Sequence, residues 1–371
     1  MYATSYPQLV DDLIPHILDA YDHWWPRDYA RLALVSPAWL AHIRKRLYEC
    51  PALHTSSSCI AFARAIEDNP LLISLVRGIS LCPAVDRDTG ASYAVKFMAS
   101  LRRVLSLPGL RKISLGGRLA VGAERFLQFL SNPQHVTELC IDGSYPDSDP
   151  STRTGTLEWD DMTACRFVRL RALTLSNLEL TVISWGASCG RLTSLELDNV
   201  AVVGGSIIDV MSDSLDTLRS LRVCVRDVSN AASMDELLCE LTERCTALES
   251  VSYEHSSQMV YAFMVTAPSH CPSVRKLRLS GLFVHGVVHL VERCNNLEVL
   301  EVVGHEVRID SMVWANLIAS DVIPTLRQLT ISPPYWYPRD PCQLNERYHL
   351  LRVACAKRHI ALSLDPCWSK F

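Results

Sequence analysis

The stretch Leu192-Thr-Ser-Leu195-Glu-Leu197 decides the fold of this chain, because the same pattern of apolar residues at its first, fourth and sixth positions recurs along most of the sequence. A degenerate copy and nine clear copies begin, in chain order, at Val76, Leu110, Val136, Leu170, Leu192, Leu218, Leu248, Val274, Leu297 and Leu326. The alternation of apolar and polar residues at the end of each copy is typical of a short strand with one buried face. Because a short strand repeated at regular spacing buries that face against its neighbouring copies, the sequence predicts a stack of parallel strands.

The copies are about 28 residues apart on average, which is the period of a leucine-rich repeat. Segments with helical spacing lie between them, and the clearest runs from Met234 to Cys245 with apolar residues at i, i+3, i+4 and i+7. Residues 124–130 and 287–294 show similar spacing, and a last strand is expected over 360–364. We therefore expect an α/β solenoid, a leucine-rich-repeat arc of about ten repeats plus a terminal strand, with strands inside and a helix after each strand outside.

Composition excludes several classes of protein. The chain has 371 residues, 49% hydrophobic and 20% charged, which is typical of a globular protein. A net charge of -4 without any block of like charges argues against a nucleic-acid partner. No apolar run approaches 18 residues, and no basic-then-apolar leader precedes Asp11. We expect no membrane partner and a soluble protein of the cytoplasm, the nucleus or both.

The fourteen cysteines include no C-x-x-C pair, and several share one place in the repeat. Those that lie three residues before the first apolar residue of a copy are Cys189, Cys245, Cys271 and Cys294. The equivalent residues in other copies are Phe167, Leu215 and Ile323. The sequence therefore predicts a buried apolar position, where a free cysteine acts as a small hydrophobic residue and neither binds metal nor forms a disulfide.

The first fifty residues follow a different pattern, that of short helices joined by brief turns. Pro15 is compatible with the first helix if Asp12 is its N-cap, because a proline in the first turn loses no hydrogen bond. Three short helices bury little surface by themselves, so this segment needs a surface to pack on.

This N-terminal stretch, from residue 6 to about residue 48, resembles the fungal form of the F-box. The matching residues are Pro7, Leu9, Asp11, Leu13, Ile14, Ile17, Leu34, Val35, Ser36, Trp39, Leu47 and Tyr48. An F-box followed by leucine-rich repeats is a familiar architecture of substrate receptors in cullin-RING (SCF) ubiquitin ligases. The resemblance implies an F-box-like helical domain over residues 1–50 and a leucine-rich-repeat domain over 51–371.

The same resemblance implies two partners and no reaction or cofactor of the chain's own. A Skp-family adaptor, and through it the cullin ligase core, would bind the N-terminal helices, and an unknown protein substrate would bind the repeats. The adaptor-binding residues would be Pro7, Leu9, Leu13, Ile14, Ile17, Leu34, Val35, Trp39 and Leu47. An alternative is a ligase-independent interaction scaffold, in which the N-terminal helices only cap the repeats.

Candidate substrate-binding residues follow from the alternation of side chains along each strand. The residue between the last two apolar positions should point out of the concave face, and Glu196 and Arg222 lie on neighbouring strands, as do Arg278 and Glu301. These charges either pair with one another or offer a mixed-charge groove to a ligand, and we favour pairing. The aromatic run Tyr335-Trp336-Tyr337 is either a second anchor for a partner or a cap on the solenoid.

Signals for catalysis are weak. His285 and His289 have a zinc-compatible spacing, but no glutamate lies between them and no third ligand is evident, so we expect no metal site. Asp160 and Asp161 are more typical of the first turn of a helix than of an acid-base pair. Gly204 and Gly205 precede an expected helix without the other residues of a phosphate-binding loop, and residues 143–155 have the composition of an exposed loop. We therefore expect a binding protein and not an enzyme.

Overall fold

The computed structural model describes residues 9–20, 24–84, 91–144, 155–183, 190–227, 231–255, 271–280, 291, 293–303, 311–320, 322–332 and 348–364. The chain forms two compact units. Unit 1 contains residues 1–114 and 129–132, and unit 2 contains residues 115–128 and 133–371. Residues 51–114 thus group with the N-terminal helices, and the domain boundary expected at residue 50 stays a prediction.

The described residues contain a large parallel sheet of twelve strands. In the order in which they pair, its strands are β1 (Ala52–Thr55), β2 (Gly78–Ala84), β3 (Lys112–Gly116), β4 (Glu138–Asp142), β6 (Ala172–Ser176), β8 (Ser194–Asp198), β10 (Ser220–Val225), β11 (Ser250–His255), β12 (Lys276–Ser280), β13 (Val299–Val303), β14 (Gln328–Ile331) and β15 (Ala361–Leu364). Every copy of the repeat pattern is a strand, as predicted, and so is the expected last strand. Only β1 lacks the pattern and was not predicted.

The register of the sheet aligns equivalent residues of successive copies. Leu195 is opposite Leu173 on one side and Leu221 on the other, and all three side chains are buried. Strands β4, β6 and β8 each alternate buried and half-buried residues, which confirms the expected alternation. Burial of each leucine contributes about 1.5–3 kcal/mol relative to an exposed one, and the contribution repeats at every strand.

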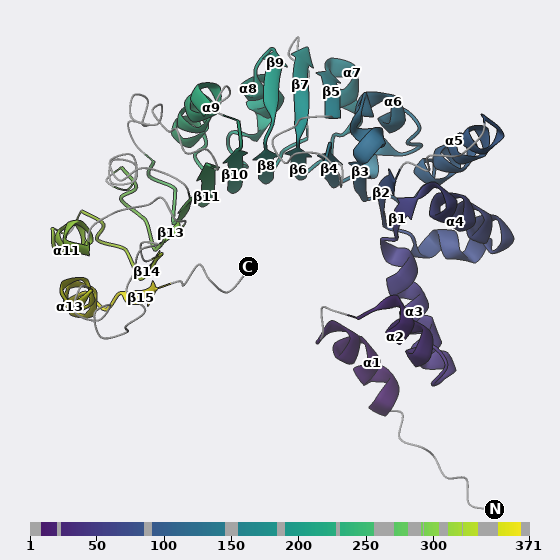
Figure 1. Cartoon of the computed structure of the whole chain (residues 1–371), viewed down its shortest axis with the longest axis horizontal. Helices are drawn as coiled ribbons and strands as arrows, with labels where there is room; N and C mark the ends of the chain where they lie inside the picture. Colours follow the sequence, from purple (N-terminus) through teal and green to yellow (C-terminus); the bar gives the residue numbers. More distant parts are fainter. Residues whose placement is uncertain are drawn as a thin grey trace, which may run out of the picture. The chain divides into compact units, whose positions relative to one another are not determined.

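The described part of unit 2 contains the helices α6 (Ala123–Leu127), α7 (Asp161–Arg166), α8 (Ile207–Met211), α9 (Ala231–Arg244), α11 (Ser311–Ala319) and α13 (His349–Lys357), with 3-10 turns at η2 (Gly117–Ala120), η3 (Pro133–His135) and η4 (Ser212–Ser214). Within this unit, the segments that follow the strands of the main sheet lie on one side of it (Figure 1). The helix expected from Met234 to Cys245 is confirmed as α9. The helix expected over 287–294 lies largely outside the described residues.

Three repeats contain a further strand between two strands of the main sheet, where the sequence predicted only a helix. The repeats that begin with β4, β6 and β8 contain β5 (Gly155–Asp160), β7 (Leu178–Ile183) and β9 (Ala201–Gly204), which form a second parallel sheet of order β5-β7-β9. Helices α7 and α8 still follow β5 and β9. The physical reason is visible in β7, whose residues alternate between buried and more exposed positions with the period of two that a strand requires.

Two buried asparagines turn the chain from one sheet into the other. Asn177 and Asn199 have φ values of 51° and 55°, in the left-handed region that asparagine tolerates better than most residues. The Asn199 side-chain amide donates a hydrogen bond of 2.9 Å to Asn177 Oδ1, and the Asn177 amide donates one of 2.8 Å to Ser144 Oγ. The polar side chains that these turns bury are therefore hydrogen-bonded to one another.

Unit 1 contains α1 (Leu9–Asp19), α2 (Pro26–Leu32), α3 (Pro37–Glu49), α4 (Ser56–Asp68) and α5 (Ala91–Leu105), the 3-10 turn η1 (Pro70–Leu75), β1, β2 and the start of β3. The three short N-terminal helices are confirmed. The cap predicted for the first of them is wrong, because α1 begins at Leu9 and Pro15 lies inside it. A proline there removes one backbone hydrogen bond, and burial of Ile14 and Leu18 on either side of it offsets that loss.

The third helix has the start signal that its sequence indicates. Ser36 caps α3 by accepting a hydrogen bond of 3.3 Å from the backbone N–H of Trp39, and Pro37 occupies the first helical position, where it loses no partner. Among the described helices of both units, none combines the length and the apolar character needed to cross a membrane.

Candidate functional site

The three N-terminal helices have a small apolar core of their own. Ile14 and Leu18 of α1 pack against Trp39 and Ile43 of α3, and all four side chains are buried. Half-buried residues from the turn before α2 and from α2 itself surround this core, and the Trp24 indole N–H donates a hydrogen bond of 3.1 Å to the Leu18 carbonyl. The helices are therefore held together without help from the apolar residues on their outer side.

Five large aliphatic side chains of these helices are exposed, and we call them the apolar surface. Their exposed fractions are 48% for Leu13, 42% for Ile17, 88% for Leu34, 63% for Val35 and 42% for Leu47. Leu13 and Ile17 lie one turn apart on the same face of α1, and Leu34 and Val35 are adjacent in the turn between α2 and α3. Apolar side chains left in water and not needed by the core are typical of a protein-binding site.

The predicted adaptor-binding residues divide into three groups. Leu13, Ile17, Leu34, Val35 and Leu47 form the apolar surface, whereas Ile14 and Trp39 belong to the helical core. Pro7 and the side chain of Leu9 lie outside what the structure describes. An aliphatic pattern in three short helices does not separate Leu13 from Ile14, because adjacent residues can face opposite sides of a helix.

One exposed aromatic residue of these helices, Trp25, was not predicted from the sequence. The Trp25 side chain is 63% exposed, and the Arg27 guanidinium lies 5.9 Å from the centre of its ring. Trp25 precedes α2, and the Asp28 carboxylate accepts a hydrogen bond of 3.1 Å from its backbone N–H. The only signal for this residue was the unusual number of aromatic residues between the first and third helices.

In unit 2, the charged residues predicted on the sheet face lie beside one another as the register requires. Arg222 pairs in register with Glu196, and their charged groups are 2.8 Å apart. Arg278 pairs with Glu301 at 2.9 Å, and Lys276 approaches the same carboxylate at 3.4 Å. The favoured interpretation, that these charges pair with one another, agrees with this geometry, and their role in binding a substrate stays a prediction.

One ion pair on that face, between Arg226 and Asp198, was not predicted. Arg226, just after β10, donates hydrogen bonds of 2.9 and 2.8 Å to the two carboxylate oxygens of Asp198, and this contact raises the pKa of the guanidinium. Asp198 follows the alternation of β8, but Arg226 lies beyond the end of its strand, where no period applies. The two-pronged geometry makes this pair more rigid than its neighbours.

A buried carboxylic acid lies between α9 and the main sheet. The Tyr253 hydroxyl donates a hydrogen bond to Asp235 Oδ1, and both side chains are about 1% exposed. Burial raises the pKa of Asp235 to about 6, although the hydrogen bond from Tyr253 acts in the opposite direction. The other oxygen, Oδ2, has no hydrogen-bond partner among the described residues.

Two of the weaker sequence predictions are confirmed. Asp160 caps α7 by accepting a hydrogen bond of 2.7 Å from the Thr163 N–H, and the contact with Thr163 lowers the pKa of Asp160. The cysteine position of the repeat is buried at Cys245, Cys271 and Cys294, and burial raises the pKa of Cys245 to about 11.

Several predicted features fall outside the described residues. They are Cys189, His285, His289, the aromatic run Tyr335-Trp336-Tyr337 and most of the predicted exposed loop, residues 145–154. Among the residues that are described, no group of three or more His, Cys, Asp and Glu side chains is arranged to hold a metal ion.

No model of a known protein family matches this sequence, and no curated protein sequence matches it significantly. A functional assignment therefore depends on the chain's own residues.

Proposed function

We propose that this chain is a substrate-recognition subunit of a cullin-RING (SCF) ubiquitin ligase. Its N-terminal helices would bind a Skp-family adaptor, and its leucine-rich repeats would hold a target protein. The observation that carries the proposal is the apolar surface, because five residues of the F-box-like pattern are exposed while the helices that bear them already have a core.

Energetics support a partner at this surface. Complete burial of an exposed leucine or valine contributes about 1.5–3 kcal/mol, and Leu34 alone has nearly its whole side chain to bury. Five such side chains could therefore supply much of the affinity of a protein complex, even after the cost of association is subtracted. Residues kept only for folding of the three helices would be expected inside the core.

The role of the repeats is positional in this proposal. A parallel sheet with one polar face offers a wide surface to a protein, and the adaptor fixes that surface near the ubiquitin carrier. Binding both partners raises the effective concentration of the target at the carrier, while the chemistry takes place on other subunits.

A second candidate is a ligase-independent scaffold in which the N-terminal helices cap the repeats. One observation favours it: the chain just after α3 joins the sheet directly. The Glu49 carbonyl accepts a hydrogen bond of 2.8 Å from the Arg77 N–H, and the Pro51 carbonyl accepts one of 3.0 Å from the Ser80 N–H. The helices could thus protect the first strands without binding an adaptor.

Capture of a purified Skp-family adaptor by the full-length chain tests the proposal. Leu34→Asp should abolish capture, because it places a charge in the apolar surface, while the unfolding temperature should stay unchanged. Leu71→Asp is the matched control, since Leu71 is 80% exposed, lies in η1 of the same unit and is not part of the apolar surface.

Equal capture by the two variants would contradict the proposed adaptor surface. If the unchanged chain captures no adaptor, and deletion of residues 1–50 makes the repeats insoluble, the scaffold with capping helices is the correct interpretation.

A further inference from the structure

A groove of unit 1 is lined by α4, by α5 and by Phe129, and the adaptor proposal does not use it. We call it the α4–α5 groove. Its volume is about 620 Å³, compared with about 360 Å³ and 330 Å³ for two hollows among the described residues of unit 2. Small side chains leave this space, among them Ala63 of α4 and Ala99 and Ser100 of α5. The groove is within the range of about 300–1,000 Å³ that is usual for ligand sites.

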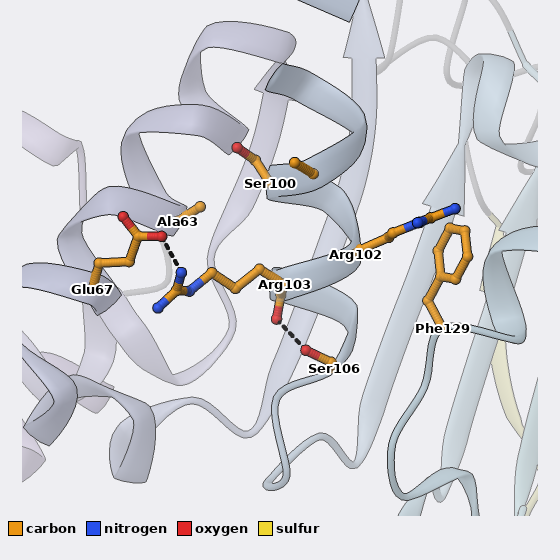
Figure 2. Close-up of a pocket in the computed structure, with 8 residues that line it drawn as sticks. Ala63, Glu67, Ser100, Arg102, Arg103, Ser106 and Phe129 are labelled. Atoms are coloured by element: carbon orange, nitrogen blue, oxygen red, sulfur yellow. Dashed lines mark hydrogen bonds and ion pairs between the residues drawn. The ribbon is translucent and has the colours of Figure 1, made fainter. Parts of the chain in front are cut away.

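The two arginines of the groove have different surroundings, which Figure 2 shows on opposite sides of α5. The Arg103 side chain points toward α4 and forms an ion pair with Glu67. The Arg102 side chain points the other way, and its guanidinium lies 4.8 Å from the centre of the Phe129 ring. Among the described residues Arg102 has no carboxylate partner, so these three charged groups leave the groove with one uncompensated positive charge.

The contact with the Phe129 ring orders the Arg102 guanidinium in a way that favours binding of an anion. A guanidinium that lies over an aromatic face keeps the N–H groups along its edge available, and these match the two oxygens of a carboxylate. Contact with Phe129 also restricts a side chain that is otherwise costly to order on binding. The neighbouring Ser106 hydroxyl is engaged already, since it donates a hydrogen bond of 2.9 Å to the Arg103 carbonyl. Arg102 is therefore the group that a ligand would meet.

A single uncompensated cation suits a carboxylate better than a nucleic acid, which requires a row of cations to neutralise successive phosphates. The groove is open to solvent and not enclosed, so it suits a protein segment better than a buried small molecule. We propose that the α4–α5 groove of unit 1 is a docking site for an acidic protein segment, whose carboxylate pairs with Arg102 beside Phe129. This site is independent of the apolar surface, because its residues come from other segments of the chain.

Fluorescence anisotropy on the full-length chain tests the site, with a labelled tetraglutamate peptide as the probe and a labelled tetraglutamine peptide as its neutral match. Arg102→Gln should weaken tetraglutamate binding about tenfold, because the charge-assisted pair is lost. Arg64→Gln is the matched control, since Arg64 is an exposed arginine of α4 that does not line the groove, and it should change the affinity less than twofold. Phe129→Leu should weaken binding while the net charge stays the same, provided that thermal unfolding shows an intact fold.

Four results would overturn the site. They are no tetraglutamate binding at millimolar concentration, equal binding of the two peptides, equal losses in Arg102→Gln and Arg64→Gln, and tighter binding of a labelled oligothymidylate than of tetraglutamate. None of them bears on capture of the adaptor, so the two proposals fail separately.

Discussion

The N-terminal helices and the repeats of unit 2 place polar and apolar groups in opposite ways. The helices enclose an apolar core and still leave Leu34 and Val35 in water, whereas the sheet face of unit 2 pairs its charges and the interior behind it holds Asp235. Exposed apolar groups are available to a partner, while paired charges must first give up contacts that they already have. We therefore expect the apolar surface to supply affinity and the charged sheet face to select among targets.

The largest expected effect on stability comes from placing a charge in the apolar core of the N-terminal helices. Ile14→Asp would bury an unpaired carboxylate among Leu18, Trp39 and Ile43, at a cost of about 3–5 kcal/mol in the free energy of unfolding. Because three short helices have little stability to lose, we expect this segment to unfold, which far-ultraviolet circular dichroism and limited proteolysis would detect.

Asp12→Asn in the same helix is the control, since Asp12 is exposed in the first turn and should change stability by less than about 0.5 kcal/mol. A folded Ile14→Asp variant with normal protease resistance would show that Ile14 is not part of a cooperative core.

A smaller change, an increase in stability, is expected when the buried Asp235 of unit 2 is replaced by asparagine. The folded state raises the pKa of Asp235 from 3.8 to about 6, so the folded protein binds this proton more tightly than the unfolded chain does. The contribution of Asp235 to stability is therefore most favourable below pH 4, declines as the pH rises to about 6 and then stays constant. Asp235→Asn removes this titration and should stabilise the protein by about 1–3 kcal/mol at pH 7.5.

Urea unfolding at pH 4.5 and pH 7.5 measures this difference. The stabilisation by Asp235→Asn should be larger at pH 7.5. Asp209→Asn, at an exposed position of α8, is the control for the loss of one carboxylate elsewhere in the unit. A constant difference between Asp235→Asn and the unchanged chain across this range would mean that Asp235 titrates normally in the folded state.

The parts of the fold and of the candidate sites that could be predicted from the sequence are those that recur in every repeat. The strands and the pairing of Arg222 with Glu196 follow from a pattern that occurs ten times, so each copy supports the alignment of the others. The second sheet was missed because only three repeats contribute a strand to it, and β7 has no more than six residues in which to show a period of two. The burial of Asp235 was not predicted because it depends on Tyr253, a residue of a different element that only tertiary packing brings near.

In the N-terminal helices, the sequence did not predict which apolar residues are buried and which are exposed. Their aliphatic pattern identified a group of residues, but it could not divide them into core and surface, because the helices are short and occur once. Ile14 and Leu13 differ by one position, yet the first is buried and the second is half exposed. The groove residue Phe129 had no signal at all, since a contact with Arg102 depends on how distant segments of unit 1 pack.

The smallest expected effect concerns the charge pairs on the sheet face. A double-mutant cycle between Glu196→Gln and Arg222→Gln should give a coupling of about 0.2–1 kcal/mol, because both groups are partly exposed. The cycle between Asp198→Asn and Arg226→Gln should give a larger value, since that pair has two hydrogen bonds and is less exposed. Both cycles are measured by urea unfolding at low and high salt, and the Glu196 coupling should be the more salt-sensitive. Equal couplings for the two pairs would mean that geometry does not decide their strength. A negligible Glu196–Arg222 coupling would instead leave both groups available to a target at little cost, and the sheet face would then contribute affinity as well as selectivity.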